Sequence, residues 1–184
     1  MGKGYTVDKL TREIAVEEYI TRFYRPDEVL GYCRACSNYG KQWGCPPFDF
    51  DVVERLSRFR TIRLIATKIT FLDKSKSPCE LSDLLRPERV RLEEELLALE
   101  CEYNGLACTY IGECLHCSKG VCARLKGEPC CHPEKVRPSL EAYGFDIAKT
   151  MTELFGIELK WSANNALPEY LVLVCGVLHN GKVK

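Results

Sequence analysis

Residues 61–111 decide the fold that we expect, and they read TIRLIATKITFLDKSKSPCELSDLLRPERVRLEEELLALECEYNGLACTYI. Residues 61–72 are rich in β-branched side chains, which predicts a strand. Residues 86–103 mix apolar and charged side chains at helical spacing, and Asn104-Gly105 supplies the stop signal of a helix. A second strand is predicted at 106–111. The stretch therefore encodes a strand–helix–strand unit.

Further elements are expected on both sides of this unit. Helices are predicted at 8–24 and 51–59, and a further helix at 139–156 is either continuous or interrupted at Gly144. A last strand is predicted in the apolar run 170–178. This order implies an α/β fold with right-handed crossovers, built as a small three- to four-stranded sheet packed with helices. We expect one domain over 1–184, with cysteine-rich metal-binding loops at about 31–48 and 112–137.

Composition and charge exclude several classes of protein. The chain has 26 basic and 26 acidic side chains, so nothing draws it as a whole to a nucleic acid. The longest apolar run is only strand-sized, and the first residues lack the apolar centre of a secretory signal. We therefore expect a cytoplasmic protein with no membrane and no nucleic-acid partner. In a reducing cytosol, 12 cysteines predict metal binding or catalysis rather than disulfides.

Eight of the cysteines form two groups. The first group, in CRACSNYGKQWGCPPF, has the spacing C-x2-C-x8-C, and the second, in GECLHCSKGVCARLKGEPCC, has the spacing C-x2-C-x4-C-x7-C with one further cysteine. Each opens with the pair spacing that lets two thiolates converge on one metal centre. The candidate metal ligands are Cys33, Cys36, Cys45, Cys114, Cys117, Cys122, Cys130 and Cys131. The isolated Cys79, Cys101, Cys108 and Cys175 are expected to be small buried side chains.

The spacing favours iron–sulfur clusters, and two [4Fe-4S] clusters are expected, with zinc as the alternative. Structural zinc sites pair two short knuckles, whereas the second group here collects four thiolates in succession, as ferredoxin-type loops do. A proline directly after Cys45 also fits a cluster loop.

The assignment of thiols to clusters leaves two possibilities open. Cys114, Cys117, Cys122 and Cys130 can complete one four-iron cluster, which leaves three thiols in the first group. Either Cys131 reaches across as the fourth ligand of the first cluster, or one iron of that cluster is open.

The same residues carry a family resemblance. The C-P-P element of the first group, the second group and the element RPSLEAYGFD that follows it resemble a family of predicted metal-binding proteins of unknown function, from about Cys33 to about Phe155. The resemblance implies metal binding through the cysteines of both groups up to Cys130. In this family the next position is usually basic, whereas Cys131 stands here.

Several other side chains near the cysteines invite interpretation. His116 and His132 are expected to donate hydrogen bonds next to the thiolates rather than to bind metal, and Tyr39 and Trp43 either shield a cluster or pack the loop. Arg137 and Glu141 either line a pocket or have only local roles. A basic stretch is read as a solvated face or as a docking site for an acidic partner, and it comprises Arg55, Arg58, Arg60 and Arg63.

Three functions follow from these patterns. The first is an electron-transfer protein with a redox partner protein, and the second is an enzyme whose cluster has an open iron in the three-cysteine group. The third is a zinc-stabilised interaction module. Motifs for phosphate, dinucleotide or zinc-protease sites are not found in the sequence, so flavin and nicotinamide cofactors have no support.

Overall fold

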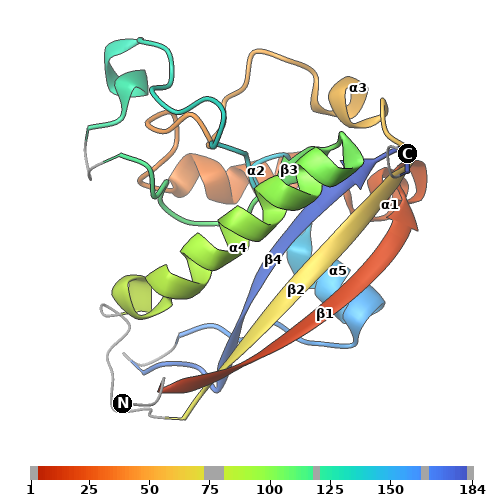
Figure 1. Cartoon of the computed structure of the whole chain (residues 1–184), viewed down its shortest axis with the longest axis vertical. Helices are drawn as coiled ribbons and strands as arrows, with labels where there is room; N and C mark the ends of the chain where they lie inside the picture. Colours follow the sequence, from red (N-terminus) through yellow and green to blue (C-terminus); the bar gives the residue numbers. More distant parts are fainter. Residues whose placement is uncertain (1–3, 73–80, 118–120, 163–165, 182–184) are drawn as a thin grey trace.

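The computed structural model describes residues 4–72, 81–117, 121–162 and 166–181. These residues form one four-stranded sheet in the order β1-β2-β4-β3, and each neighbouring pair is antiparallel (Figure 1). The strands are β1 (Tyr5–Ala15), β2 (Thr61–Phe71), β3 (Leu106–Cys108) and β4 (Tyr170–His179). The helices are α1 (Val16–Phe23), α2 (Pro26–Ala35), α3 (Val52–Leu56), α4 (Leu81–Tyr103) and α5 (Ile147–Thr150). The expected α/β class is confirmed.

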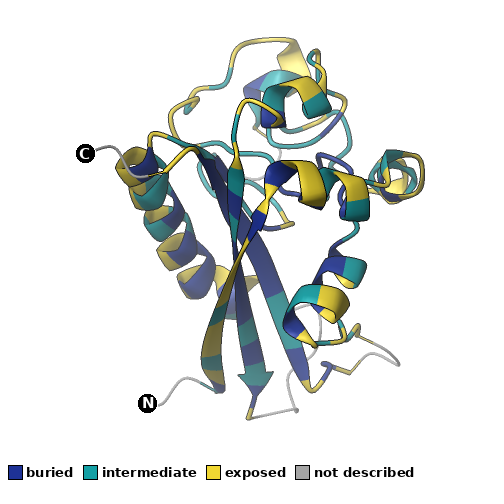
Figure 2. Cartoon of the chain, turned by 90° about the vertical axis from the view of Figure 1, so that its right-hand side faces the viewer, coloured by how far each residue is buried: buried dark blue, intermediate teal, exposed yellow. Residues whose placement is uncertain are grey.

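The two central strands are buried on both faces, which explains their nearly continuous apolar sequences. In β2, Ile62 and Leu64 belong to one hydrophobic cluster, whereas Ile65 and Ile69 face the other side of the sheet. Leu96 of α4 belongs to the same cluster as Ile65. Figure 2 shows α4 on one side of the sheet and the shorter helices on the other. The sheet is therefore the middle of three layers.

Segments near α1 and α5 fix the position of α2, which carries the first cysteines. Tyr19 of α1 stacks on Phe145 with ring centroids 4.7 Å apart, and both side chains are buried. The backbone N–H of Asp146 donates to the carbonyl of Phe23 at 2.9 Å, and that of Arg25 donates to the carbonyl of Gly144 at 2.9 Å. The start of α2 is thus held against the segment that follows the second cysteine group.

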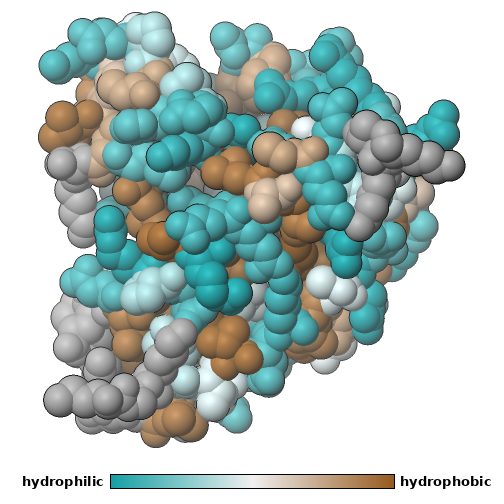
Figure 3. Space-filling model, in the orientation of Figure 1, coloured by the Kyte–Doolittle hydropathy of each residue, from teal (hydrophilic) through white to brown (hydrophobic). Residues whose placement is uncertain are grey.

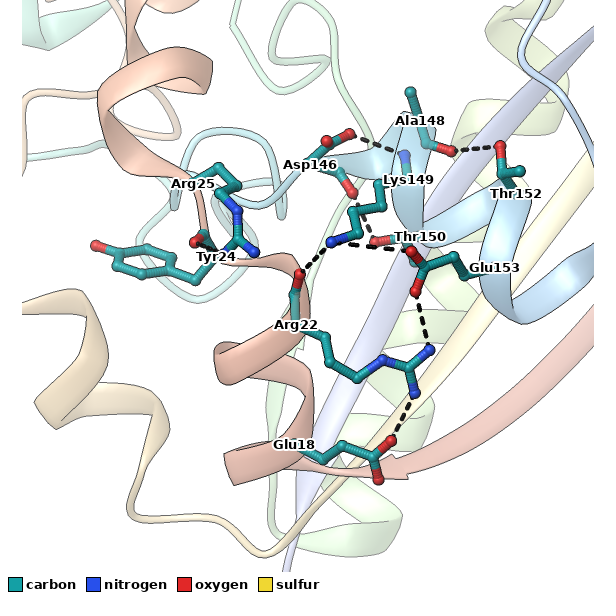
Figure 4. A network of polar contacts seen from close by, with 10 residues as sticks. All are labelled: Glu18, Arg22, Tyr24, Arg25, Asp146, Ala148, Lys149, Thr150, Thr152 and Glu153. Carbon is teal, nitrogen blue, oxygen red and sulfur yellow. Dashed lines mark hydrogen bonds and ion pairs between the residues drawn. The ribbon is translucent and has the colours of Figure 1, made fainter.

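A polar network on the surface reinforces the contact between α1 and α5 (Figure 4). Arg22 donates to Glu18 at 2.6 Å and to Glu153 at 2.9 Å, and Lys149 Nζ donates to the Arg22 carbonyl at 3.1 Å. Asp146 caps α5 by accepting the Lys149 N–H at 2.8 Å. Each exposed pair contributes little, so the network mainly sets the orientation of the two helices.

Two expectations about the elements are corrected. Residues 8–15 were predicted to be helical but lie in β1, an edge strand that pairs with β2 along its whole length. Its charged residues are typical of an exposed edge strand, and their spacing between apolar residues resembles that of a helix. In the segment 139–156 only the part after Gly144 is helical, because α5 begins at Ile147 and continues as a π-helical segment, Met151–Phe155, that ends at Gly156 as expected. The helix α4 crosses between β2 and β3, which run parallel to each other because each is antiparallel to β4 between them.

The molecular surface is mostly hydrophilic on the face that α4 covers. Hydrophilic residues take most of this face, and hydrophobic residues appear in several separate places between them (Figure 3). None of the helices in the described ranges has the length and apolar character needed to cross a bilayer.

Candidate metal centre

The first cysteine group lies at the C-terminal end of α2 and in the loop that follows it. Cys33 is in the last turn of α2, and Cys36 caps the helix with its N–H donating to the Cys33 carbonyl at 3.0 Å. The N–H of Gly40 donates to the Pro46 carbonyl at 2.9 Å, which closes the loop carrying Cys45. Placement of the whole group on a loop was therefore wrong for Cys33, which is helical.

The second cysteine group occupies irregular backbone after β3. Cys122 precedes a short 3₁₀ turn, Ala123–Lys126. The Sγ atom of Cys130 accepts the backbone N–H of His132 at 3.4 Å. A hydrogen bond of this kind tunes a metal that is bound to the sulfur.

Two side chains tie the cysteine groups together. Gln42 of the first group accepts the backbone N–H of Cys114 through Oε1 at 2.8 Å. Arg124 of the second group donates to three backbone carbonyls of the first, those of Gln42 (2.7 Å), Cys45 (2.5 Å) and Pro47 (2.6 Å). Figure 1 shows the two segments side by side at the upper left. The two groups thus form one structural unit although about seventy residues separate them in the chain.

A cavity of about 290 Å³ lies between the two groups. Four of the eight candidate thiols line it, namely Cys33, Cys36, Cys45 and Cys114. The other four are outside its lining among the described residues, and they are Cys117, Cys122, Cys130 and Cys131. In the sequence Cys114 belongs to the second group, but in the structure it lines the same cavity as the three thiols of the first group.

Another wall of the cavity comes from α4 and the residues after β3. Arg89 and Glu93 lie one turn apart on α4, and both line the cavity. Arg89 Nη2 donates to the Glu113 carbonyl at 2.5 Å, and its guanidinium lies 5.1 Å from the centre of the Tyr110 ring. Gly112 has φ +136°, and a Cβ atom there would lie 2.6 Å from Arg89 Nη2. Only glycine therefore lets the chain pass this close to the guanidinium.

Arg137 and Glu141 also line the cavity, as the pocket hypothesis expects. Arg137 donates to both carboxylate oxygens of Glu100, with Nε–Oε1 2.9 Å and Nη2–Oε2 2.7 Å. Glu100 Oε1 in turn accepts the Ala107 N–H at 2.8 Å, so this pair joins α4 and β3 to the cavity. Burial raises the pKa of Glu141 to about 7, and its Oε2 atom has no hydrogen-bond partner among the described residues.

The thiols of the first group are costly to ionise without a bound cation. Burial and the nearby Cys36 and Cys33 raise the pKa of Cys45 to about 11, and Cys114 adds to this effect. Burial likewise raises the pKa of Cys33 and of Cys114. A metal centre would supply the positive charge that such a set of thiolates requires.

The donor set fits a thiolate-binding metal or cluster. Thiolates are the ligands that zinc and iron–sulfur clusters both prefer, and the chain concentrates them in two adjoining groups. Within the described ranges, no three cysteine, histidine or acidic side chains converge on one point as ligands of a single ion. The fit rests on the chemistry of the donors and on the position of four of them around the cavity.

The isolated cysteines meet the expectation only in part. Cys108 and Cys175 are fully buried, and Cys175 Sγ lies 3.6 Å from the Ile65 carbonyl oxygen. Cys101 is exposed on α4, so its predicted burial is wrong. Cys79 lies outside the described residues.

The aromatic side chains of the first group have different environments. Tyr39 lines the cavity, which is consistent with shielding. Trp43 is 38% exposed, its Nε1 donates to the Glu128 carbonyl at 3.2 Å, and Arg124 lies 5.2 Å from its ring centre. Trp43 therefore packs the two loops together.

The nearest polar contacts of His116 and His132 are with other protein groups. His116 lines the cavity, and its Nε2 lies 3.4 Å from Glu93 Oε2. Burial raises the pKa of Glu93. His132 lies beside His116, with ring centres 6.0 Å apart, and it serves Cys130 through its backbone N–H rather than its ring.

The basic stretch does not form one face, because two of its members lie on different elements. Arg58, in the turn after α3, pairs with Glu54 at 3.0 Å, whereas Arg63 is on β2 and donates to the Tyr103 hydroxyl at 2.8 Å. Its role in docking stays a prediction.

Sequence reasoning missed Gln42, Arg124 and the polar residues of α4. The run ERVRLEEELLALE was assigned no chemistry, yet Arg89 and Glu93 reach the cavity. Their i, i+4 spacing on one helical face was the available signal. Gln42 and Arg124 carried no signal beyond lying between the cysteines.

The comparison with known families agrees with these features. Residues 20–178 match the family described as predicted metal-binding protein (DUF2284). The chain belongs to this family. The match extends beyond the resemblance noted from the motifs and includes both cysteine groups and β4. No curated protein and no solved structure matches the chain.

Proposed function

We propose that this metal-binding protein carries iron–sulfur clusters, two of the [4Fe-4S] type, and that it transfers electrons. The observation that supports the proposal best is the junction of the two cysteine groups through Gln42 and Arg124. Metal centres in two groups tied by direct hydrogen bonds would lie close together. Electrons could then pass from one centre to the other within a single small domain.

The ligand spacing supports clusters over zinc. The second group provides its thiolates in succession along one segment, and neither group ends in the second short knuckle of a structural zinc site. Hydrogen bonds from backbone N–H groups to Cys36 Sγ and Cys130 Sγ are of the kind that sets cluster potentials. The proposal includes a redox partner protein that delivers or removes the electrons.

The test is to purify the protein without oxygen and to measure iron, acid-labile sulfide and zinc per chain. About eight irons with matching sulfide, and a visible spectrum that bleaches reversibly on reduction, are expected for two four-iron clusters. A colourless protein with about one or two zinc ions per chain would overturn the proposal and favour the zinc-stabilised module.

The cavity supports a second candidate, an enzyme whose first cluster has an open iron. Three of its lining residues have buried polar atoms without a hydrogen-bond partner among the described residues: Arg89 (Nε), Thr109 (Oγ1) and Glu141 (Oε2). Unsatisfied buried polar groups are costly unless a ligand or water completes them. Cyanide added to the reduced protein should change its electron paramagnetic resonance spectrum if an iron is open, and should leave the spectrum unchanged if all irons have thiolate ligands.

A further inference from the structure

The sequence order of the cysteines leaves the first group one thiolate short. Cys33, Cys36 and Cys45 supply three ligands, and the second segment holds five cysteines. A four-iron cluster with a thiolate on every iron needs four. One of the five must therefore serve the first group if both centres are complete, and the structure favours one of them.

Cys114 has the surroundings of a first-group ligand. It lines the same cavity as Cys33, Cys36 and Cys45. Its backbone N–H donates to Gln42 Oε1 at 2.8 Å, so a side chain from inside the first group holds it in place.

The remaining four thiols, Cys117, Cys122, Cys130 and Cys131, are outside the lining of this cavity among the described residues. Cys131 is exposed and is not among the described residues that line the cavity. To bind the first centre, Cys131 would have to enter a cavity that Cys114 already lines.

We infer that Cys114 is the fourth thiolate of the first centre, together with Cys33, Cys36 and Cys45. The second centre is then held by Cys117, Cys122, Cys130 and Cys131. This assignment rests on the proposed function and completes it, because every metal of both centres has a protein thiolate. It replaces the bridging role that the sequence suggested for Cys131. Two-cluster ferredoxins likewise take one ligand of a cluster from the cysteine run of the other.

Gln42 and Arg124 acquire a specific role under this assignment. Gln42 holds the backbone at Cys114, and Arg124 holds the carbonyl of Cys45. Both are positioning residues, since each acts on a ligand through its backbone. The first centre thus depends on a segment that also carries the second.

The test first removes the second centre by replacing Cys122 and Cys130 with alanine. This background variant should keep about four irons per chain, half the content of the unmodified protein. In that background, Cys114→Ala should lower the iron content further and change the electron paramagnetic resonance signal of the reduced protein. Cys131→Ala should change neither, and the exposed Cys101→Ala on α4 is the control for a lost thiol.

A loss of the remaining iron with Cys131→Ala but not with Cys114→Ala would overturn the assignment, and so would an absence of any effect from both. Alkylation of the metal-loaded background variant followed by mass spectrometry gives a second measurement that needs no further substitution. Cys114 should be protected and Cys131 labelled, and the opposite pattern again contradicts the assignment.

Failure of the proposed function is read separately, from the unmodified protein. If it holds zinc in place of iron, the redox role fails, while zinc per chain and the alkylation pattern of the same variants still decide the assignment. If it holds no metal at all, both inferences are wrong.

Discussion

Arg124 offers the sharpest test of how the two cysteine groups depend on each other. Replacement of Arg124 by methionine keeps an apolar side chain of similar length next to Trp43. It removes the three hydrogen bonds that the guanidinium donates to the first group. Two of the three hydrogen bonds are partly buried, and the bond to Pro47 is exposed, where water can replace the donor. At about 1 kcal/mol for each bond, the variant should lose about 2–3 kcal/mol of the free energy that holds the loops together.

This loss corresponds to an increase of about 30- to 150-fold in the population of the opened first loop, at 1.4 kcal/mol for each factor of ten. We therefore expect Arg124→Met to release metal to a chelator faster by one to two orders of magnitude. Lys126→Met is the matched control, because this exposed cation lies on the same 3₁₀ turn. The reasoning is refuted if Arg124→Met releases metal at the rate of the control.

Three further predictions separate the scaffold from the site. Glu100→Gln weakens the paired hydrogen bonds to Arg137 and should lower the free energy of unfolding by about 1–3 kcal/mol, measured by urea denaturation. Leu96→Ala removes a buried contact of α4 with the sheet and should cost about 2–5 kcal/mol while metal per folded chain stays unchanged. Burial raises the pKa of Cys175 to about 12. Alkylation of the native protein at pH 8 should therefore label the exposed Cys101 and leave Cys175 unmodified until the chain unfolds. Equal labelling of the two cysteines would contradict the buried position of Cys175.

The elements that the sequence predicted correctly are those whose own residues specify them. The β2 and β4 strands are apolar on both faces because helices or loops cover each face of the sheet, and this gives long β-branched runs. The helix α4 is long enough for its periodicity to be recognised. In contrast, β1 has one neighbouring strand and an exposed side, so pairing with β2, rather than residue pattern, decides its conformation.

In the candidate site, too, the features set by local sequence were predicted and those set by distant contacts were not. The grouping of the cysteines follows from local spacing, and the family match agrees with the metal binding that the spacing predicts. The division of thiols at the cavity depends on contacts between residues far apart in the chain, such as the hydrogen bond from Cys114 to Gln42. Local spacing carries no information about such contacts, and for this reason the cysteine order suggested Cys131 or an open iron where we propose Cys114.

The occupant of the fourth ligand position decides what the cavity can do. If Cys114 binds the fourth iron, no iron is free to accept a substrate, and the polar wall with Arg89 and Glu141 acts only on the charge and hydration of the centre. If Cys114 belongs to the second group, an open iron faces that same wall, and its unsatisfied polar atoms become a binding site for a small polar molecule. Electron transfer and catalysis therefore differ here by one thiolate. The cyanide response of the background variant without Cys122 and Cys130, before and after Cys114→Ala, addresses that difference directly. If Cys114 is the fourth thiolate, cyanide should have no effect on the background variant and should act only after Cys114 is removed.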